Sequence, residues 1–165
     1  MSFTLRDAYP MIVSLYKKGD VLVVKILKFY EKTKFLLNKK CKNTSPKKAR
    51  PIVIIESHNE QVTFFALSKN FDYEDIRPRF YISRCRISKK AQECFNLDLK
   101  RTQYSLVFAK KTKTKKLRYT FTINIHLLKE LEDEGLVKYC GNCDEKFIEQ
   151  EKINIDKYFE DLYGR

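Results

Sequence analysis

The stretch KKARPIVIIESHNEQVTFFALSKN, residues 47–70, decides the fold that this sequence predicts. It holds two apolar runs, PIVIIES (51–57) and QVTFFAL (61–67), separated by a short polar turn. Runs rich in β-branched and aromatic residues around such a turn are typical of a β-hairpin. In an antiparallel hairpin the start of the first strand lies beside the end of the second. The polar and basic residues at those strand ends should therefore cluster: Lys48, Arg50, Ser68 and Lys69.

The rest of the chain predicts further strands, with helices gathered toward its end. Strands are expected over residues 20–30, 79–87, 102–109, 117–125 and, as a short last strand, 136–141. Helical segments are expected over residues 4–16, 71–77, 88–97 capped by Ser88, 126–135 stopped by Gly135, and 145–164. We therefore expect one α+β domain over residues 1–165, a small curved antiparallel β-barrel with peripheral and C-terminal helices.

Charge is divided unevenly along the chain. Lysine and arginine total 34 and the acids 21, a net charge of +13. Residues 1–125 carry 28 basic and 10 acidic residues, a net charge of +18, whereas residues 126–165 carry 6 and 11, a net charge of −5. A basic body with an acidic tail indicates a polyanion as partner, RNA or DNA first. The alternative is an ordinary solvated, lysine-rich surface.

Composition also bears on the compartment. No stretch reaches the roughly 18 consecutive apolar residues that a membrane span needs. Arg6 and Asp7 stand before the first apolar segment, a pattern that does not fit a secretory signal. Five cysteines, an odd number, favour free thiols in a reducing cytoplasm. We therefore expect a cytoplasmic protein without a membrane partner.

The residue types at the hairpin ends suit metal-independent RNA cleavage. In that reaction the 2′-hydroxyl attacks its own phosphate, so the enzyme needs cations for the oxyanion and groups that move protons. Arg50 can grip phosphate oxygens in a fork, Lys48 and Lys69 supply point charges, and Ser68 can donate a hydrogen bond. These four are the candidate catalytic residues. The alternative is that they only solvate the strand ends.

Three segments in order, KKGDVLVVKI (17–26), RPIVIIE (50–56) and VTFFALS (62–68), resemble the start of the MazF/PemK toxin family. The shared features are Gly19-Asp20 before an apolar strand, Arg50-Pro51 before the next, and Ser68 at the end of the third. The resemblance covers residues 18–70. It implies an SH3-like barrel that cleaves single-stranded RNA without metal, with Arg50 as the phosphate-binding arginine and Ser68 in the place of the family's Thr or Ser.

Two features resemble the type III branch of that family, the ToxN, AbiQ and CptN toxins. They are Lys48 before the second strand and the third-strand end Leu67-Ser68-Lys69, which is similar to a Thr-Ser-x-Lys end. The resemblance implies a bacterial toxin–antitoxin system of the abortive-infection kind. Its partners would be a structured, repeat-derived antitoxin RNA and a cellular single-stranded RNA substrate, in a possible toxin–RNA oligomer. A MazF-type toxin neutralised by a protein antitoxin stays open.

Further basic residues are expected to hold phosphates of a folded RNA, with affinity that falls steeply with salt. They lie in two loops, at Lys39, Lys40, Lys42 and Lys47, and at Lys110, Lys111, Lys113, Lys115, Lys116 and Arg118. Two tyrosines are candidates for stacking on unpaired bases, Tyr30 and Tyr81. For any one aromatic residue the alternative is packing in the core.

Rival chemistries rest on weaker patterns. His58 and His126 would be an acid–base pair, although nothing in their spacing brings them together. Cys140 and Cys143 would be half a zinc site completed by Cys85 and Cys94, or a redox pair, against the expectation of free buried thiols. We expect no metal and no cofactor. The other functional classes are a non-catalytic RNA-binding module and a protein-binding poison on the related CcdB barrel.

Overall fold

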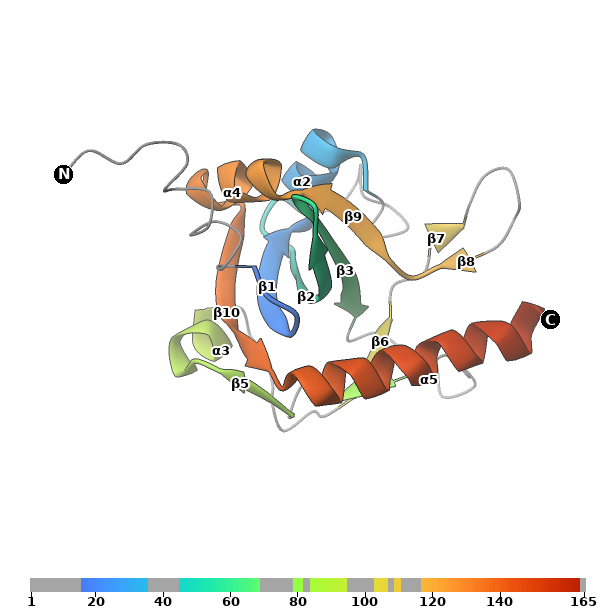
Figure 1. Cartoon of the computed structure of the whole chain (residues 1–165). Helices are drawn as coiled ribbons and strands as arrows, with labels where there is room; N and C mark the ends of the chain where they lie inside the picture. Colours follow the sequence, from blue (N-terminus) through green and yellow to red (C-terminus); the bar gives the residue numbers. More distant parts are fainter. Residues whose placement is uncertain are drawn as a thin grey trace.

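A computed structural model describes residues 16–35, 45–68, 79–81, 84–94, 103–106, 109–110 and 117–163. Nearly all of the helix expected over residues 4–16, and the whole helical turn expected over 71–77, lie outside these residues. The described part is an α+β structure in which a curved antiparallel sheet lies between helices (Figure 1). None of its helices is long and apolar enough to cross a membrane.

The centre of the sheet is made of the strands β1 (Asp20–Lys25), β2 (Ala49–His58) and β3 (Gln61–Ser68). The predicted hairpin is confirmed, because β2 and β3 pair antiparallel from Ile52↔Ala66 to His58↔Gln61. Its turn residues Asn59 and Glu60 have φ angles of 49° and 65°. Positive φ at both positions is the geometry of the two-residue turns that match the twist of a hairpin.

The remaining strands continue the sheet on both sides of this centre. They are β4 (Arg79–Tyr81), β5 (Cys85–Ile87), β6 (Gln103–Leu106), β9 (Phe121–Asn124) and β10 (Val137–Cys143). Hydrogen-bonded neighbours follow the order β4-β6-β3-β2-β1-β10-β5, and β9 pairs with the first half of β3. A separate two-stranded ladder joins β7 (Ala109–Lys110) to β8 (Leu117–Arg118).

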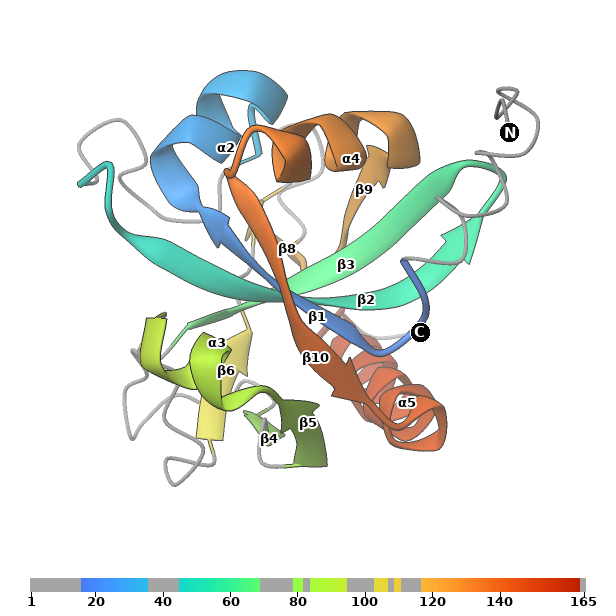
Figure 2. The same ribbon diagram turned by 90° about the vertical axis from the view of Figure 1, so that its left-hand side faces the viewer.

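The sheet curls back on itself, as Figure 2 shows. Strands β4 and β5 stand at opposite ends of the hydrogen-bonded order, yet only residues 82–84 separate them in the chain. A segment of that length spans at most about 14 Å. The two ends of the sheet are therefore held close by the chain itself, and no ladder joins β4 to β5 within the described residues.

Four predicted strands are wrong in extent. The stretch 102–109 is divided between β6 and the start of β7, and the stretch 117–125 between β8 and β9, which belong to different ladders. The stretch 20–30 changes from strand β1 to helix α2 (Ile26–Thr33) after Lys25. The stretch 79–87 is two strands, because β4 pairs with β6 and β5 pairs with β10 at opposite ends of the sheet. In the stretches 20–30 and 79–87 the pattern of apolar residues continues past the end of β1 and of β4, so the local sequence does not indicate where these two strands end.

Strands β1 to β3 pack side chains on both faces of the sheet. One face, with Leu22, Ile52 and Phe64, packs under α2 and α4 (Ile125–Asp133) and is called the α2–α4 face here. The other face packs against α3 (Lys89–Cys94) and α5 (Glu145–Tyr163). Alternate residues of a strand point to opposite faces, which explains why these strands read as continuous apolar runs.

The predicted helix ends are confirmed where the structure describes them. Ser88 Oγ accepts a hydrogen bond from the Ala91 N–H at 3.1 Å, which is the expected N-cap of α3. Gly135 has φ +79° just after α4, which suits its role as the stop. Tyr119, between β8 and β9, joins this region to helix α5, because its hydroxyl donates a hydrogen bond to Asp156 Oδ1 at 2.6 Å.

The expectation of free thiols is wrong for Cys85 and Cys143, which form a disulfide between β5 and β10. A β-bulge explains the position of Cys140: Val21 pairs with Gly141 and Leu22 with Tyr139, so Cys140 is the extra residue of β10. A bulge shifts the alternation of side chains by one position. Cys140 and Cys143 therefore belong to the same core cluster, with Cys140 buried.

The zinc alternative finds no support in this region. Among the described residues, no group of three or more histidine, cysteine, aspartate or glutamate side chains is arranged to hold a metal ion. Cys143 is already bonded to Cys85. The side chain of Cys94 lies outside the described part of the chain.

Candidate functional site

The open end of the β2–β3 hairpin holds three of the four predicted catalytic residues, and we call Lys48, Arg50 and Ser68 the rim. The paired part of the hairpin ends at Ile52↔Ala66, and beyond it β3 continues to Ser68 by pairing with β6. Arg50 Nη1 donates a hydrogen bond to the carbonyl oxygen of Leu67 at 2.9 Å. The structure thus places the Arg50 side chain at the carbonyl of Leu67, the residue before Ser68. Lys69 lies outside the described residues.

The three rim residues differ in exposure. Arg50 is 7% exposed, Ser68 is half-buried, and Lys48 is exposed. Lys48 is held by its backbone, since its carbonyl accepts from the Ile26 N–H at 3.1 Å and its own N–H donates to Ser45 O at 3.0 Å. An exposed ammonium two residues from a buried guanidinium can attract an anion toward a less solvated cation.

Most of the predicted RNA-binding residues lie outside the described residues: Lys39, Lys40, Lys42, Lys111, Lys113, Lys115 and Lys116. Lys47 is exposed beside Lys48. Strands β7 and β8 pair through Lys110↔Leu117 and Ala109↔Arg118, so the lysine-rich segment between them joins two antiparallel strands as predicted. Tyr81 is placed only by its backbone, opposite Gln103.

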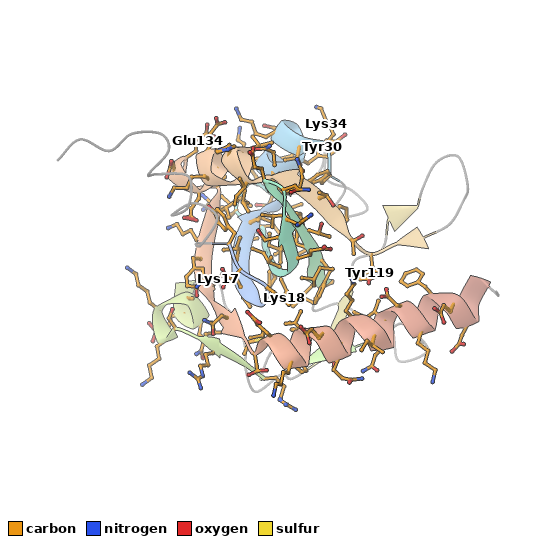
Figure 3. The ribbon with its side chains drawn as sticks, viewed as in Figure 1. Lys17, Lys18, Tyr30, Lys34, Tyr119 and Glu134 are labelled. Carbon is orange, nitrogen blue, oxygen red and sulfur yellow. A yellow bond between two sulfur atoms is a disulfide. The ribbon has the colours of Figure 1, made fainter. Side chains whose placement is uncertain are left out.

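Tyr30 lies on α2 next to Lys34, as Figure 3 shows. Its ring is half-buried against the α2–α4 face, and Lys34 Nζ stands 5.5 Å from the ring centroid. Lys34 ends the helix with φ 63°, a conformation that turns the chain sharply. A cation over the ring already uses one of its faces, so a base that stacks there must displace Lys34.

Sequence spacing missed that both histidines belong to the same end of the β2–β3 hairpin. His126 Nε2 lies 3.6 Å from Glu60 Oε2, and the Ile125 N–H donates to Glu60 O at 2.8 Å. His58 pairs with Gln61 across the same turn. Both histidines therefore belong to the closed end of the β2–β3 hairpin, opposite to the rim. The pairing of residues 121–124 with the start of β3 brings them there, and the local sequence carries no signal for that pairing.

The Gly-Asp pair of the family resemblance has a structural explanation. Gly19 has φ +96°, and a Cβ atom there would overlap the carbonyl oxygen of Cys143. The Gly19 N–H donates to Ile54 O at 2.7 Å, and the Cys143 N–H donates to Gly19 O at 2.7 Å. The Asp20 carboxylate accepts from the Lys17 N–H at 2.8 Å. The pair thus forms a corner that joins β1, β2 and β10.

Asp20 gives the fold a pH dependence of its own. The residue is 5% exposed, and burial raises the pKa of its carboxyl to about 6, partly opposed by Lys17. Because the folded pKa is raised, the native state holds a proton that the unfolded state has released. This contribution to stability is present below about pH 4 and is lost as the pH rises through about 6.

We expect Asp20→Asn to remove this loss while keeping an oxygen for the Lys17 N–H. The difference in unfolding free energy between variant and wild type should shift by about 2 kcal/mol in favour of the variant from about pH 4 to about pH 7. Urea unfolding at the two pH values measures it. A difference that is the same at both pH values would contradict the assigned role of burial.

Comparison of the chain with protein-family models, with curated proteins and with solved structures found no match in any of the three.

Proposed function

We propose that the chain is a metal-independent endoribonuclease toxin that binds and cuts single-stranded RNA at the rim. One observation carries the proposal: buried Arg50 donates a hydrogen bond to the carbonyl oxygen of Leu67, the residue before Ser68, and exposed Lys48 stands two residues before Arg50 in the chain. The residue types that phosphate transfer needs thus share one end of two adjacent strands. The net charge of +18 over residues 1–125 supports a nucleic acid as ligand.

In the proposed reaction the substrate supplies its own nucleophile. The 2′-oxygen forms a bond to phosphorus, the bond from phosphorus to the 5′-oxygen breaks, and a proton moves from the former oxygen to the latter. The products are a 2′,3′-cyclic phosphate and a 5′-hydroxyl. Arg50 and Lys48 would stabilise the charge on the phosphate oxygens, and Ser68 would hold one oxygen by a hydrogen bond. Lys69 would complete the set from the next position in the chain.

The resemblance to the type III branch extends the proposal to partners and architecture. The curved sheet would be an SH3-like barrel of the MazF/PemK kind, and the protein would act in the cytoplasm. A structured antitoxin RNA would occupy the rim in place of substrate, so inhibition and cleavage would use the same residues. Tandem short repeats before a terminator, just upstream of the gene, would support an RNA antitoxin. A small acidic open reading frame there would favour a protein antitoxin.

The burial of Arg50 favours a second candidate, a non-catalytic RNA-binding module. A guanidinium that is 7% exposed and bonded to Leu67 O can serve the hairpin alone, tying the end of β3 to β2. In that case the exposed lysines would bind phosphates without any cleavage.

Incubation of the protein with mixed-sequence RNA and excess EDTA separates the two candidates. We expect fragments with 2′,3′-cyclic phosphate ends, and no cutting of an all-2′-deoxy copy that lacks the nucleophile. Intact RNA held in a complex would overturn the endonuclease and support the module. Fragments that carry 3′-hydroxyl ends would contradict the proposed chemistry, because attack by the 2′-oxygen cannot give them.

A further inference from the structure

Lysines follow one side of helix α2, an arrangement that the strand predicted for residues 20–30 does not give. Lys25 is its N-cap, and Lys28 and Lys32 follow at three and seven residues further on. At 100° per residue Lys28 and Lys32 lie about 40° apart around the helix axis, whereas Lys25 is still in the extended backbone of β1 (φ −76°, ψ 112°) and stands at the start of the helix. The helix buries Ile26 and Phe29 on another side, and all three lysines are exposed. The spacing therefore gives α2 one apolar face toward the sheet and one cationic face toward solvent.

These lysines begin where the rim begins. Lys25 is the Cα partner of Ala49, the residue between Lys48 and Arg50. The Ile26 N–H donates to Lys48 O at 3.1 Å, so the start of the helix is bonded directly to a rim residue. Exposed Lys47 adds a further cation at this junction.

Little negative charge opposes these lysines on the helix itself. Glu31 is the one acidic residue of α2, and its Oε2 lies 3.4 Å from Lys28 Nζ. The side chains of that pair are 51% and 49% exposed for Lys28 and Glu31. An ion pair so exposed gives little net stabilisation, so Lys28 can exchange it for a phosphate at small cost.

We propose that Lys25, Lys28 and Lys32 form a phosphate-binding track that leads an RNA strand along α2 to the rim. The axial rise from Lys25 to Lys32 is about 10 Å, a length over which a bound strand presents more than one phosphate. The identity of the ligand as RNA rests on the proposed function. The track itself rests on the lysine spacing, their exposure and the bond from α2 to Lys48.

The test compares the triple variant Lys25→Gln, Lys28→Gln, Lys32→Gln with a matched control on α5. The control, Lys146→Gln, Lys152→Gln, Lys157→Gln, removes the same charge from three exposed positions of another helix. The probe is a fluorescent mixed-sequence RNA that carries 2′-O-methyl groups at every sugar, so binding is measured without cutting. Circular dichroism confirms that both variants are folded.

We expect the slope of log affinity against log salt to become less steep by about 2 in the α2 variant, since each lysine accounts for about 0.7 on a single strand. From about 50 to about 200 mM salt, the wild type should then lose roughly 20-fold more affinity than the α2 variant. The α5 variant should keep the wild-type slope. An α2 variant with the wild-type slope, or an α5 variant with the same loss, would overturn the track.

Two further measurements distinguish failure of this inference from failure of the function on which it rests. If the α2 variant shows the predicted change in slope but the wild type leaves unmodified RNA intact, the proposed endonuclease activity is wrong and the track is still supported. Sedimentation shows whether the lysines instead hold an acidic surface of a second copy. Self-association that is lost in the α2 variant while RNA binding is unchanged would overturn the track in favour of a protein contact.

Discussion

We expect Arg50→Lys to lower the rate of RNA cleavage by about 100-fold, because removing one preorganised donor from a developing oxyanion costs about that much. The variant keeps a positive charge and one donor for Leu67 O, at present bonded to Arg50 Nη1 at 2.9 Å. It loses the planar fork that holds two oxygens of a phosphate in a fixed geometry. Single-turnover cleavage in EDTA measures the change.

The same substitution at Arg86 is the control for Arg50. Arg86 lies on β5, is exposed, and pairs with Asn142 far from the rim in sheet order. Arg86→Lys should cleave like the wild type. If Arg50→Lys also cleaves like the wild type, Arg50 serves the hairpin and not the reaction.

We expect Gly141→Ala to lower the unfolding free energy by about 3 kcal/mol, the upper end of what an overpacked interior usually costs. A Cβ atom at Gly141 would overlap the carbonyl oxygen of Arg86 on the neighbouring strand β5. That oxygen belongs to a strand backbone, which cannot swing aside as a long side chain would. Urea unfolding at neutral pH measures the loss.

Gly135→Asn is the matched control for Gly141→Ala. Gly135 has φ +79°, and a Cβ atom there would meet nothing within 4 Å. Asparagine tolerates this left-handed conformation better than most residues, so the cost should stay below about 1 kcal/mol. Equal losses in the two variants would mean that β10 and β5 can separate more easily than their close contact indicates.

The hairpin was predictable from the sequence because every signal for it is local. The apolar runs, the polar turn and the strand ends all lie within residues 47–70, and the structure confirms strands at 49–58 and 61–68. The end of β1 was not predictable, because Ile26 and Phe29 continue the apolar run of β1 and only packing under the sheet makes them helical. Periodicity over six or eight residues cannot separate the two cases.

The long-range features of the site region had no sequence signal. The Cys85–Cys143 disulfide depends on the pairing of β5 with β10, which joins cysteines 58 positions apart in the chain. The approach of His126 to Glu60 depends on the pairing of β9 with β3. The hydrogen bond from Arg50 to the Leu67 carbonyl, in contrast, lies at the open end of a hairpin that the local sequence predicts.

Photo-crosslinking tests most directly whether RNA meets the protein at the rim. An uncleavable 2′-O-methyl RNA that contains photoreactive thiouridine is bound to the wild type, irradiated, and the attached peptides are identified by mass spectrometry. The account predicts attachment at residues 45–50 and along α2, at the open end of the β2–β3 hairpin. Attachment confined to the closed end, at His58 to Glu60 and the start of α4, would contradict it.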